Sequence, residues 1–349
     1  MRIGFWLAGN IALSGGGNGV RAQARHQAAA LERLGHEVVR LNPWNVYDTL
    51  SLDVVQFFVG GYSYYFIEEL KHRYNFLSYA PMVDSNEPHW RYRMACRLGR
   101  IHPRFHTVQG MIQQQAESAD VVIVRSTHER DRFIHSVGIS PAKIELVLNG
   151  ADAVDNVDPE LARRQLDLPR EYIAHVSSYT QPRKNVVRLC EVVGPLGYPI
   201  VIAGSREPGP IANRLSNLAR QYKNIHLLGF LDEPVLQSLY AGARAFALPS
   251  IHEGTGLVAV EAATHGVPVV ITKNGGPKDY FLDMAHYVDP FDKESIRQGI
   301  VAAWNEGPNK KLQQHVLTNL TWDKSADALI AAYQRHLRRP PYLSEPTFH

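Results

Sequence analysis

The chain has 349 residues and lacks the patterns that mark disulfide-rich and metal-dependent proteins. Its two cysteines, Cys96 and Cys190, lie far apart and form no Cys-x-x-Cys pair. This argues against a disulfide framework or a zinc site and favours a reducing compartment. The 16 histidines include no His-Glu-x-x-His pattern and no paired cysteine and histidine spacing, so we expect no bound metal.

Long apolar runs and a strong charge of one sign are also missing. No run approaches the ~18 apolar residues of a membrane-spanning helix. The N-terminal stretch MRIGFWLAGNIALSGG faintly resembles a signal peptide, but we interpret it as a buried strand that leads into a ligand loop. A net charge of +3 is too small to indicate nucleic-acid binding. We therefore expect a cytoplasmic, globular protein.

Short apolar runs of strand length alternate with helical patterns along the chain. They include EVVRLN, DVVQFFV, SYAPMVD and ADVVIVRS in the first half, and YIAHVSS, PIVIAGS, NIHLLGF, ARAFALPS and GVPVVIT in the second. Strands separated by helices indicate parallel sheets with helices on both faces. The acidic stretch from Gly150 to Pro169 has few strand signals and is predicted to link the two series.

The length and the two α/β series predict two Rossmann-like, doubly wound domains that face a central cleft. We expect an N-terminal domain over residues 1–165 and a C-terminal domain over residues 166–322. A final amphipathic helix and tail, residues 323–349, should pack back on the N-terminal domain. The carboxyl ends of both sheets would then meet one ligand in the cleft.

The stretch HEGTGLVAVE, His252 to Glu261, places two glutamates on either side of a predicted helix start. A helix from about Leu257 to His265 would end at the glycine that follows it. Its N-terminal amides and dipole favour an anion, most commonly phosphate. Glycines at 254 and 256 let a ligand approach the backbone closely.

The two glutamates have different expected surroundings. Glu261 lies on a helix that is apolar nearly all round, so its carboxylate needs hydrogen-bond donors. Ribose hydroxyls would serve, and so would a buried arginine or backbone amides; the helix alone does not decide between them. Glu253 lies in the loop, where it either interacts with the helix dipole or contacts the hydroxyls of a sugar.

The setting PSIHEGTGLVAVEAATHGVPVV resembles the Glu-x7-Glu signature of glycosyltransferase family 4, retaining enzymes with the GT-B fold. Further stretches resemble the family's landmarks in the family's order. They are GGGNGVRAQARHQAAALERLGHEV, ADVVIVRSTHERDRFI, KIELVLNGAD and NIHLLGFLDEPVLQSLYAGARAFALPS. Together these stretches cover most of the chain, so the resemblance does not depend on one short pattern.

The resemblance implies a role for each residue of this loop and helix. Glu261 would hold the ribose and Glu253 would contact the transferred sugar. The donor diphosphate would bind at the backbone of Gly254, Thr255, Gly256 and Leu257. Arg183 and Lys184 of QPRKN follow a predicted strand end and would stabilise the departing diphosphate without a metal; outside the family context they would be a solvated basic turn.

The chain departs from the family pattern in the C-terminal half at two places. Many relatives have a Gly-Arg pair where this chain has Ser177-Ser178. The family's PRKN-like variant fits better and points first to Lys184. Asp279 stands where the family commonly has a glutamate after a Gly-Gly pair, which leaves its contact with the ligand open.

The N-terminal glycine loop SGGGNGVRAQ is not a dinucleotide fingerprint. No glycine stands in the last position of Gly-x-Gly-x-x-Gly, and no acidic residue follows the second predicted strand, which argues against an NAD-dependent dehydrogenase. We expect Gly16 and Gly17 to face the diphosphate, with a plain tight turn as the alternative. Asp84 and His89 are the candidate acceptor-side residues, although the family's common histidine-aspartate pair is broken here.

The segment HWRYRMACRLGRIHPRFH contains several arginines and no acidic residue. Arg93, Arg97 and Arg100 have helical spacing on one face. A solvated basic face is one interpretation. Contact with an anionic membrane or a lipid-phosphate acceptor is the other, and it would place the protein at the inner face of the membrane.

These features predict a retaining hexosyltransferase. It would move a sugar from a nucleotide-diphosphate sugar, such as a UDP- or GDP-sugar, to a hydroxyl of a glycan, lipid-linked or small-molecule acceptor, for example in cell-surface polysaccharide synthesis. One alternative is a sugar-nucleotide epimerase or phosphorylase of related fold, and another is a non-catalytic sugar-nucleotide binding protein. No cofactor and no nucleic acid is expected.

Overall fold

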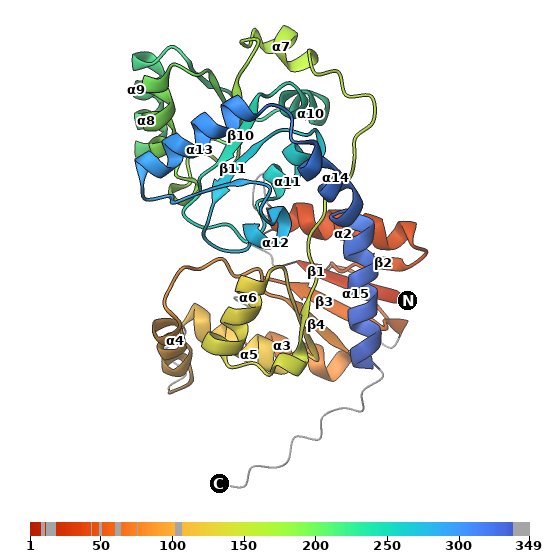
Figure 1. The fold of residues 1–349 in the computed structure, drawn as a ribbon. Coiled ribbons are helices and arrows are strands. Elements are labelled where there is room, and N and C mark those ends of the chain that lie inside the picture. The colour runs from red at the N-terminus through yellow and green to blue at the C-terminus, as the bar shows by residue number, and fades with distance from the viewer. Residues whose placement is uncertain are drawn as a thin grey trace.

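The structure is a computed structural model that describes residues 1–7, 11, 19–42, 44–48, 51–59, 64–74, 76–101 and 107–337. Within these residues the chain forms two six-stranded sheets, one above the other in Figure 1, and every strand pairs in parallel with its neighbours. Helices cover both faces of each sheet (Figure 1). The predicted pair of Rossmann-like domains is confirmed.

The N-terminal sheet has the strand order β2-β1-β3-β4-β5-β6. Its strands are β1 (Arg2–Leu7), β2 (Glu37–Arg40), β3 (Val54–Phe58), β4 (Leu77–Ala80), β5 (Val121–Val124) and β6 (Ile144–Leu146). Its helices are α2 (Gly19–Arg33), α3 (Tyr64–Arg73), α4 (His89–Ile101), α5 (Val108–Ser118) and α6 (Thr127–Arg132), which continues as a π-helical turn, Phe133–Val137. A 3-10 turn, Pro141–Lys143, leads into β6.

The C-terminal sheet has the strand order β12-β11-β10-β7-β8-β9, so the direction of winding reverses between β7 and β10. Its strands are β7 (Ile173–Val176), β8 (Ile200–Ala203), β9 (Ile225–Leu227), β10 (Ala245–Leu248), β11 (Val269–Thr272) and β12 (His286–Val288). Its helices are α7 (Leu161–Leu166), α8 (Val186–Leu196), α9 (Pro210–Gln221), α10 (Glu233–Ala241), α11 (Leu257–Thr264), α12 (Pro277–Phe281), α13 (Lys293–Glu306) and α14 (Lys310–Asn319).

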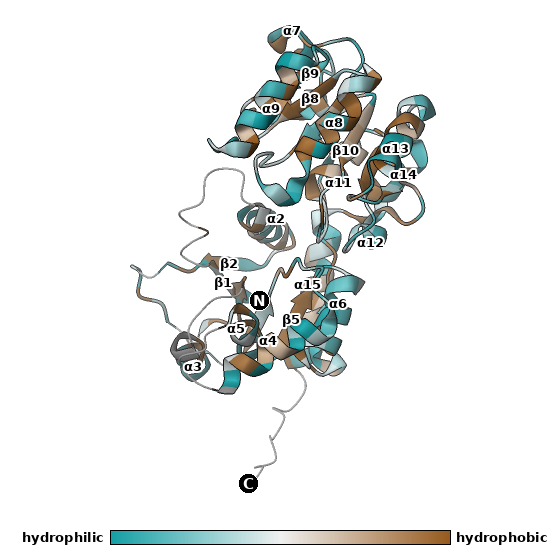
Figure 2. Cartoon of the chain, turned by 90° about the vertical axis from the view of Figure 1, so that its left-hand side faces the viewer, coloured by the Kyte–Doolittle hydropathy of each residue, from teal (hydrophilic) through white to brown (hydrophobic). Residues whose placement is uncertain are grey.

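The central strands are apolar because both faces of each sheet are covered. All residues of β3, β5, β8 and β10 are buried, which explains why these runs do not alternate between apolar and polar residues. Figure 2 shows brown, hydrophobic strands beneath helices whose outer surfaces are teal. Ligands of such open parallel sheets bind outside the carboxyl ends of the strands at the reversal point, which here lies between β7 and β10.

The last described helix, α15 (Trp322–Leu337), leaves the C-terminal domain and lies along the N-terminal one (Figure 1). It packs against α2, and its Trp322 and Tyr333 are buried in the same apolar cluster as strands β1 and β3. Arg33 of α2 donates to the Asp323 carboxylate across 2.6 Å. The helix therefore returns to the N-terminal domain as predicted, while the boundaries at residues 165 and 322 stay predictions.

Candidate functional site

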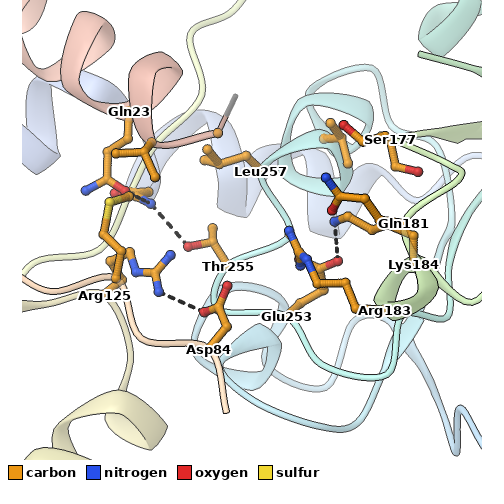
Figure 3. Close-up of a pocket in the computed structure, with 18 of the residues that line it drawn as sticks. Gln23, Asp84, Arg125, Ser177, Gln181, Arg183, Lys184, Glu253, Thr255 and Leu257 are labelled. Carbon is orange, nitrogen blue, oxygen red and sulfur yellow. Dashed lines mark hydrogen bonds and ion pairs between the residues drawn. The ribbon is translucent and has the colours of Figure 1, made fainter. Parts of the chain in front are cut away.

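A cavity of about 300 Å³ lies between the two domains, where loops from both sheets meet (Figure 3). On the N-terminal side its wall is formed by α2 and by residues that follow β4, β5 and β6: Gly19, Val20, Gln23, Met82, Asp84, Arg125 and Asn149. On the C-terminal side it is formed after β7 and β10: Val176, Ser177, Ser178, Gln181, Arg183, Lys184 and residues 253–258. The reversal point of the C-terminal sheet thus opens into the cavity.

The loop after β10 enters α11 through Gly256, and both line the cavity. Gly256 is left-handed, with φ 78°, a conformation that residues with a Cβ adopt at a cost. Among the described residues no side chain caps the N-terminus of α11, and Thr255, Gly256 and Leu257 at this end all line the cavity. A helix N-terminus that faces a cavity in this way favours an anionic group.

Gly254 lies in close contact with the N-terminal domain. A Cβ built on Gly254 would lie 2.3 Å from a carboxylate oxygen of Asp84 and 2.8 Å from the guanidinium of Arg125. Both distances are too short for a real Cβ, so Asp84 and Arg125 would have to move if this residue had a side chain. This glycine therefore lets the two domains meet at the cavity.

Glu253 and Lys184 form a buried ion pair on the cavity wall. Lys184 Nζ lies 2.6 Å from Glu253 Oε1, and the two side chains are 11% and 7% exposed. Arg183 lies farther from the same carboxylate, at 3.9 Å, and its side chain is 48% exposed. Burial alone would raise the pKa of Glu253, but the charges of Lys184 and Arg183 lower it overall, so the carboxylate is ionised.

Glu261 has a different environment, and it is not among the residues that line the cavity. Its carboxylate accepts a hydrogen bond from the hydroxyl of Tyr240 across 3.0 Å. Burial raises the pKa of Glu261 to about 7, and the Tyr240 hydrogen bond opposes this only in part. In the absence of a ligand, Glu261 is therefore on the border between its protonated and ionised forms at neutral pH.

Arg125, which follows β5, is a cavity residue that the sequence reasoning missed. Its guanidinium lies 2.8 Å from Asp84 and 3.3 Å from the buried Glu129. Burial would raise the pKa of Asp84, but the Arg125 charge lowers it overall. Arg125 follows the end of a strand, as Lys184 does. This position in the sequence could therefore have indicated Arg125 as a site residue.

A hydrogen-bond network also crosses the cleft beside the cavity. The side-chain amide of Asn149, after β6, donates to Gln23 of α2 and to the hydroxyl of Thr255, across 2.9 and 3.2 Å. The Tyr280 hydroxyl of α12 donates to the Arg125 carbonyl across 2.7 Å and accepts from the Thr255 hydroxyl across 3.2 Å. These four side chains are buried and hold the loop before α11 against the N-terminal domain.

Asp279 and His89 lie away from the cavity. Asp279 accepts hydrogen bonds from the backbone N–H and hydroxyl of Thr127, across 2.6 and 2.9 Å, at the start of α6. It therefore links the two domains at the surface. His89 begins α4, where it lies 2.6 Å from the Ser136 hydroxyl and 3.2 Å from Asp131. Gly16 and Gly17 lie outside the described residues.

The described residues contain no group of three or more histidine, cysteine, aspartate or glutamate side chains placed to hold a metal ion. Among them there is also no helix long and apolar enough to cross a membrane.

Comparison with known proteins identifies the family to which this chain belongs. Residues 158–335, about half of the chain, match the family model of the glycosyl transferases group 1. The chain belongs to this family. The matched segment contains β7, α11 and both glutamates, so the family model covers the C-terminal wall of the cavity.

Curated relatives carry one recurring name. The chain is 30% identical over 247 residues to the D-inositol 3-phosphate glycosyltransferase of Mycolicibacterium paratuberculosis, covering 65% of this chain and 55% of that protein. It is 28% identical over 256 residues to the protein of the same name from Mycobacterium tuberculosis, covering 64% and 50%. The chain thus spans about half the length of the curated relatives it matches.

Solved structures resemble the chain over nearly its whole length. Sucrose-phosphate synthase from Thermosynechococcus elongatus aligns with a TM-score of 0.75 and 17% identity over 96% of this chain and 98% of that one. Anabaena HepE in complex with UDP and glucose aligns with a TM-score of 0.60 and 18% identity over 96% and 95%. At these identities the comparison establishes the GT-B fold.

Proposed function

We propose that this chain is a retaining glycosyltransferase of family 4 that transfers a sugar from a nucleotide-diphosphate sugar to an acceptor hydroxyl. The observation that carries the proposal is the cavity itself. It brings an uncapped helix N-terminus, the Lys184 and Arg183 cations and the Glu253 carboxylate to one wall. A diphosphate fits the first two and the hydroxyls of a sugar fit the third.

The chemistry follows from where charge develops. In the transfer, the bond between the anomeric carbon and the phosphate oxygen breaks, and its electron pair stays on the diphosphate. The acceptor oxygen forms the new bond from the same face, and its proton passes to the departing phosphate oxygen. The amides at the start of α11, together with Lys184 and Arg183, stabilise the added negative charge, which is the work a metal does in other enzymes.

Glu253 has two tasks in this proposal. Its Oε1 holds the Lys184 ammonium in place across 2.6 Å. Oε2 lies 3.9 Å from Arg183, so it can accept hydrogen bonds from the hydroxyls of the transferred sugar. Closure of the two domains around the donor would exclude water and limit hydrolysis.

Glu261 is assigned to the ribose although it does not line the cavity. Within the described residues, Tyr240 is the one hydrogen-bond donor to its carboxylate, which leaves the other carboxylate oxygen available. A ribose hydroxyl would take that oxygen and favour the ionised form. UDP and GDP are the candidate carriers, and HepE, solved with UDP and glucose, supports testing UDP first.

The experiment begins with a thermal-shift panel of UDP, GDP, ADP and their sugars on the whole chain. For the best ligand, we expect Glu261→Ala to weaken donor binding and Lys184→Ala mainly to lower turnover. Product analysis with and without an acceptor then separates transfer from epimerisation, which needs no acceptor. Absence of stabilisation by every nucleotide would refute the proposal, and binding without turnover would favour a non-catalytic binding protein.

For the acceptor we propose only a broad class: a glycan, a lipid-linked sugar or a small molecule that carries a hydroxyl. Asp84 lines the cavity and can address the acceptor, although Arg125 already occupies one of its oxygens. The relatives' name, D-inositol 3-phosphate glycosyltransferase, makes a phosphorylated polyol a reasonable acceptor to include in the assay.

We also propose a peripheral contact with an anionic membrane through α4, in a form that differs from the sequence-based expectation. Arg93 donates to the His135 carbonyl and Arg100 to Glu117, so both are engaged by their own domain. Exposed apolar residues recur every fourth position instead: Trp90, Met94 and Leu98 are 67%, 49% and 45% exposed. Such a stripe beside arginines suits the surface of an anionic bilayer.

Vesicle co-sedimentation tests the α4 contact. Replacing Trp90, Met94 and Leu98 together by serine should abolish binding to vesicles that contain anionic lipid. Neutralising Arg93, Arg97 and Arg100 should weaken it and remove its salt dependence. Equal sedimentation of the wild type with and without vesicles would refute the contact.

A further inference from the structure

His175 is a buried histidine of β7 whose two ring nitrogens both have partners. Nδ1 lies 2.7 Å from the backbone carbonyl oxygen of Ala247, and Nε2 lies 2.7 Å from the hydroxyl of Ser177. A carbonyl oxygen accepts and never donates, so the proton of the ring must be on Nδ1. In the neutral ring, Nε2 is then a pure acceptor, and the Ser177 hydroxyl must donate its proton to it.

The ring is neutral at physiological pH. Burial, the largest effect, lowers the pKa of His175 to about 4, and the nearby Lys184 charge lowers it further against the opposing effects of the Ala247 hydrogen bond and Glu253. His175 is completely buried, at 0% exposure, so no solvent molecule competes for Nε2.

Ser177 lines the cavity, and its only proton is directed away from the cavity toward His175. The lone pairs that remain on its oxygen can only accept. A phosphate oxygen carries no proton to offer, so Ser177 is a poor partner for a diphosphate. To donate to a phosphate, Ser177 would have to leave Nε2 unpaired inside the protein, which is unfavourable. The Ser177 oxygen therefore suits a ligand group that donates a hydrogen bond, such as an O–H.

The surroundings of Ser177 indicate which part of the ligand this is. Figure 3 shows Ser177 on the same side of the cavity as Gln181 and Lys184, opposite Gln23 and Arg125. The charges of Lys184 and Glu253 both shift the pKa of His175, so this ion pair lies near the ring. Glu253 is a second group that can only accept once ionised. Two acceptors on one wall suit a group with several hydroxyls.

We propose that Ser177 is a specificity-determining residue whose hydroxyl oxygen accepts a hydrogen bond from one hydroxyl of the transferred sugar. His175 is the positioning residue that fixes the direction of this hydrogen bond. The inference rests on the proposed function, since it assumes a nucleotide-sugar donor in this cavity. It also gives a physical role to the serine that stands where many family members have glycine.

Calorimetric titration of the whole chain tests the proposal, with UDP, GDP, UDP-glucose and GDP-mannose as ligands. Ser177→Ala should weaken binding of the preferred nucleotide sugar about fivefold, the value of one neutral hydrogen bond, and leave the corresponding nucleoside diphosphate unchanged within twofold. Ser205→Ala is the matched control, because Ser205 donates to Ser178 behind the cavity wall and does not line it. It should leave the ratio of the two affinities unchanged.

Monofluorinated sugars identify the hydroxyl. Fluorine replaces a hydroxyl without offering a proton, so one fluorinated position should cost the wild type about fivefold and cost Ser177→Ala nothing further. Ser177→Gly should behave like Ser177→Ala, which provides a second variant if the first folds poorly.

The outcomes separate the two proposals. If the wild type binds no nucleotide sugar, the proposed function itself fails. If the wild type binds one and Ser177→Ala weakens sugar-bearing and sugar-free nucleotides equally, Ser177 addresses the nucleotide and only this inference is overturned. The inference is also overturned if Ser177→Ala does not change the affinity for the nucleotide sugar. The same holds if every fluorinated sugar weakens binding to the variant as much as it weakens binding to the wild type.

Discussion

Glu253 and Glu261 belong to one loop and one helix, yet their carboxylates have opposite electrostatic environments. Burial raises the pKa of both side chains. At Glu253 the nearby Lys184 and Arg183 charges exceed this effect and lower the pKa. At Glu261 the hydrogen bond from the neutral Tyr240 hydroxyl and the charge of Arg25 offset burial only in part, so the pKa rises to about 7. The comparison teaches that a cation in direct contact, and not the depth of burial, decides whether a carboxylate inside the fold is ionised before the ligand arrives.

The difference fits the two proposed tasks. A permanently ionised Glu253 holds Lys184 where a departing diphosphate needs a cation. Glu261 forms no ion pair and has a single hydrogen-bond donor among the described residues, so a ligand that supplies a hydroxyl completes its hydrogen bonding. One site is pre-organised by the protein and the other is completed by the ligand.

The largest expected effect comes from breaking the ion pair. Lys184→Met leaves the Glu253 carboxylate buried without its main cation, and we expect a loss of about 3 kcal/mol in the free energy of unfolding at pH 7. Urea denaturation measures it. Arg183→Met is the control: Arg183 is 3.9 Å from the carboxylate and half exposed, so its loss should be much smaller. Equal losses in both variants would contradict the ranking of the two cations.

Adding Glu253→Gln to Lys184→Met sharpens the test, because the double variant has no buried charge left to stabilise. We expect it to recover part of the lost stability while activity stays low. No recovery would show that packing, and not charge, caused the loss.

The second effect is a dependence of the free energy of unfolding on pH, caused by the raised pKa of Glu261. Its pKa in the folded chain, about 7, is above the ordinary value of 4.5. Its contribution to stability is therefore complete below about pH 4.5 and is lost as the pH rises through 7. Glu261→Gln keeps the acceptor for Tyr240 and cannot ionise, so it should be more stable than the wild type by on the order of 2 kcal/mol at pH 8 and equally stable at pH 4. Denaturation midpoints of both proteins, measured from about pH 4 to about pH 8, test this expectation. A stability difference that does not change with pH would contradict the raised pKa of Glu261.

The smallest effect concerns the hydroxyl beside Glu261. Tyr240→Phe removes the hydrogen bond that lowers the pKa of Glu261, so this pKa should rise further above 7, with a loss of stability of about 1 kcal/mol or less. Carbon-13 NMR of the glutamate carboxyls follows the titration. Tyr179→Phe removes a comparable hydrogen bond, to the Leu228 carbonyl, and should leave the Glu261 titration unchanged.

Much of the architecture could be predicted because it depends on local patterns. The strands of both sheets are apolar runs, and α11 begins at Leu257 as expected because glycines precede it and an apolar run follows. Strands β6 and β12 were not predicted: each has only three residues, and these include Glu145 and His286, whereas the equally short β9 lies in the longer apolar run NIHLLGF. Their existence depends on pairing with a neighbouring strand, which no local pattern contains.

The candidate site was predictable in part for the same reason. Thr255, Gly256, Lys184 and Glu253 were found because glycine turns, strand ends and buried carboxylates leave a mark in the sequence. Arg125 was overlooked, although it follows a strand end too. Buried polar residues such as Asn149 and Tyr280 leave no such mark, because their partners are more than 100 residues away in the chain.

The sequence by itself determined the two α/β series, the glycine-flanked start of α11 and the types of residue available for a diphosphate and a sugar, because these depend on neighbours along the chain. Only the tertiary structure decided which groups meet. It placed Lys184 against Glu253, paired Glu261 with the Tyr240 hydroxyl, directed the Ser177 proton toward His175, and placed Asp279 at the contact between the domains. Hydrogen bonds and ionisation depend on distances of a few ångströms between residues far apart in the chain, and the fold alone sets those distances.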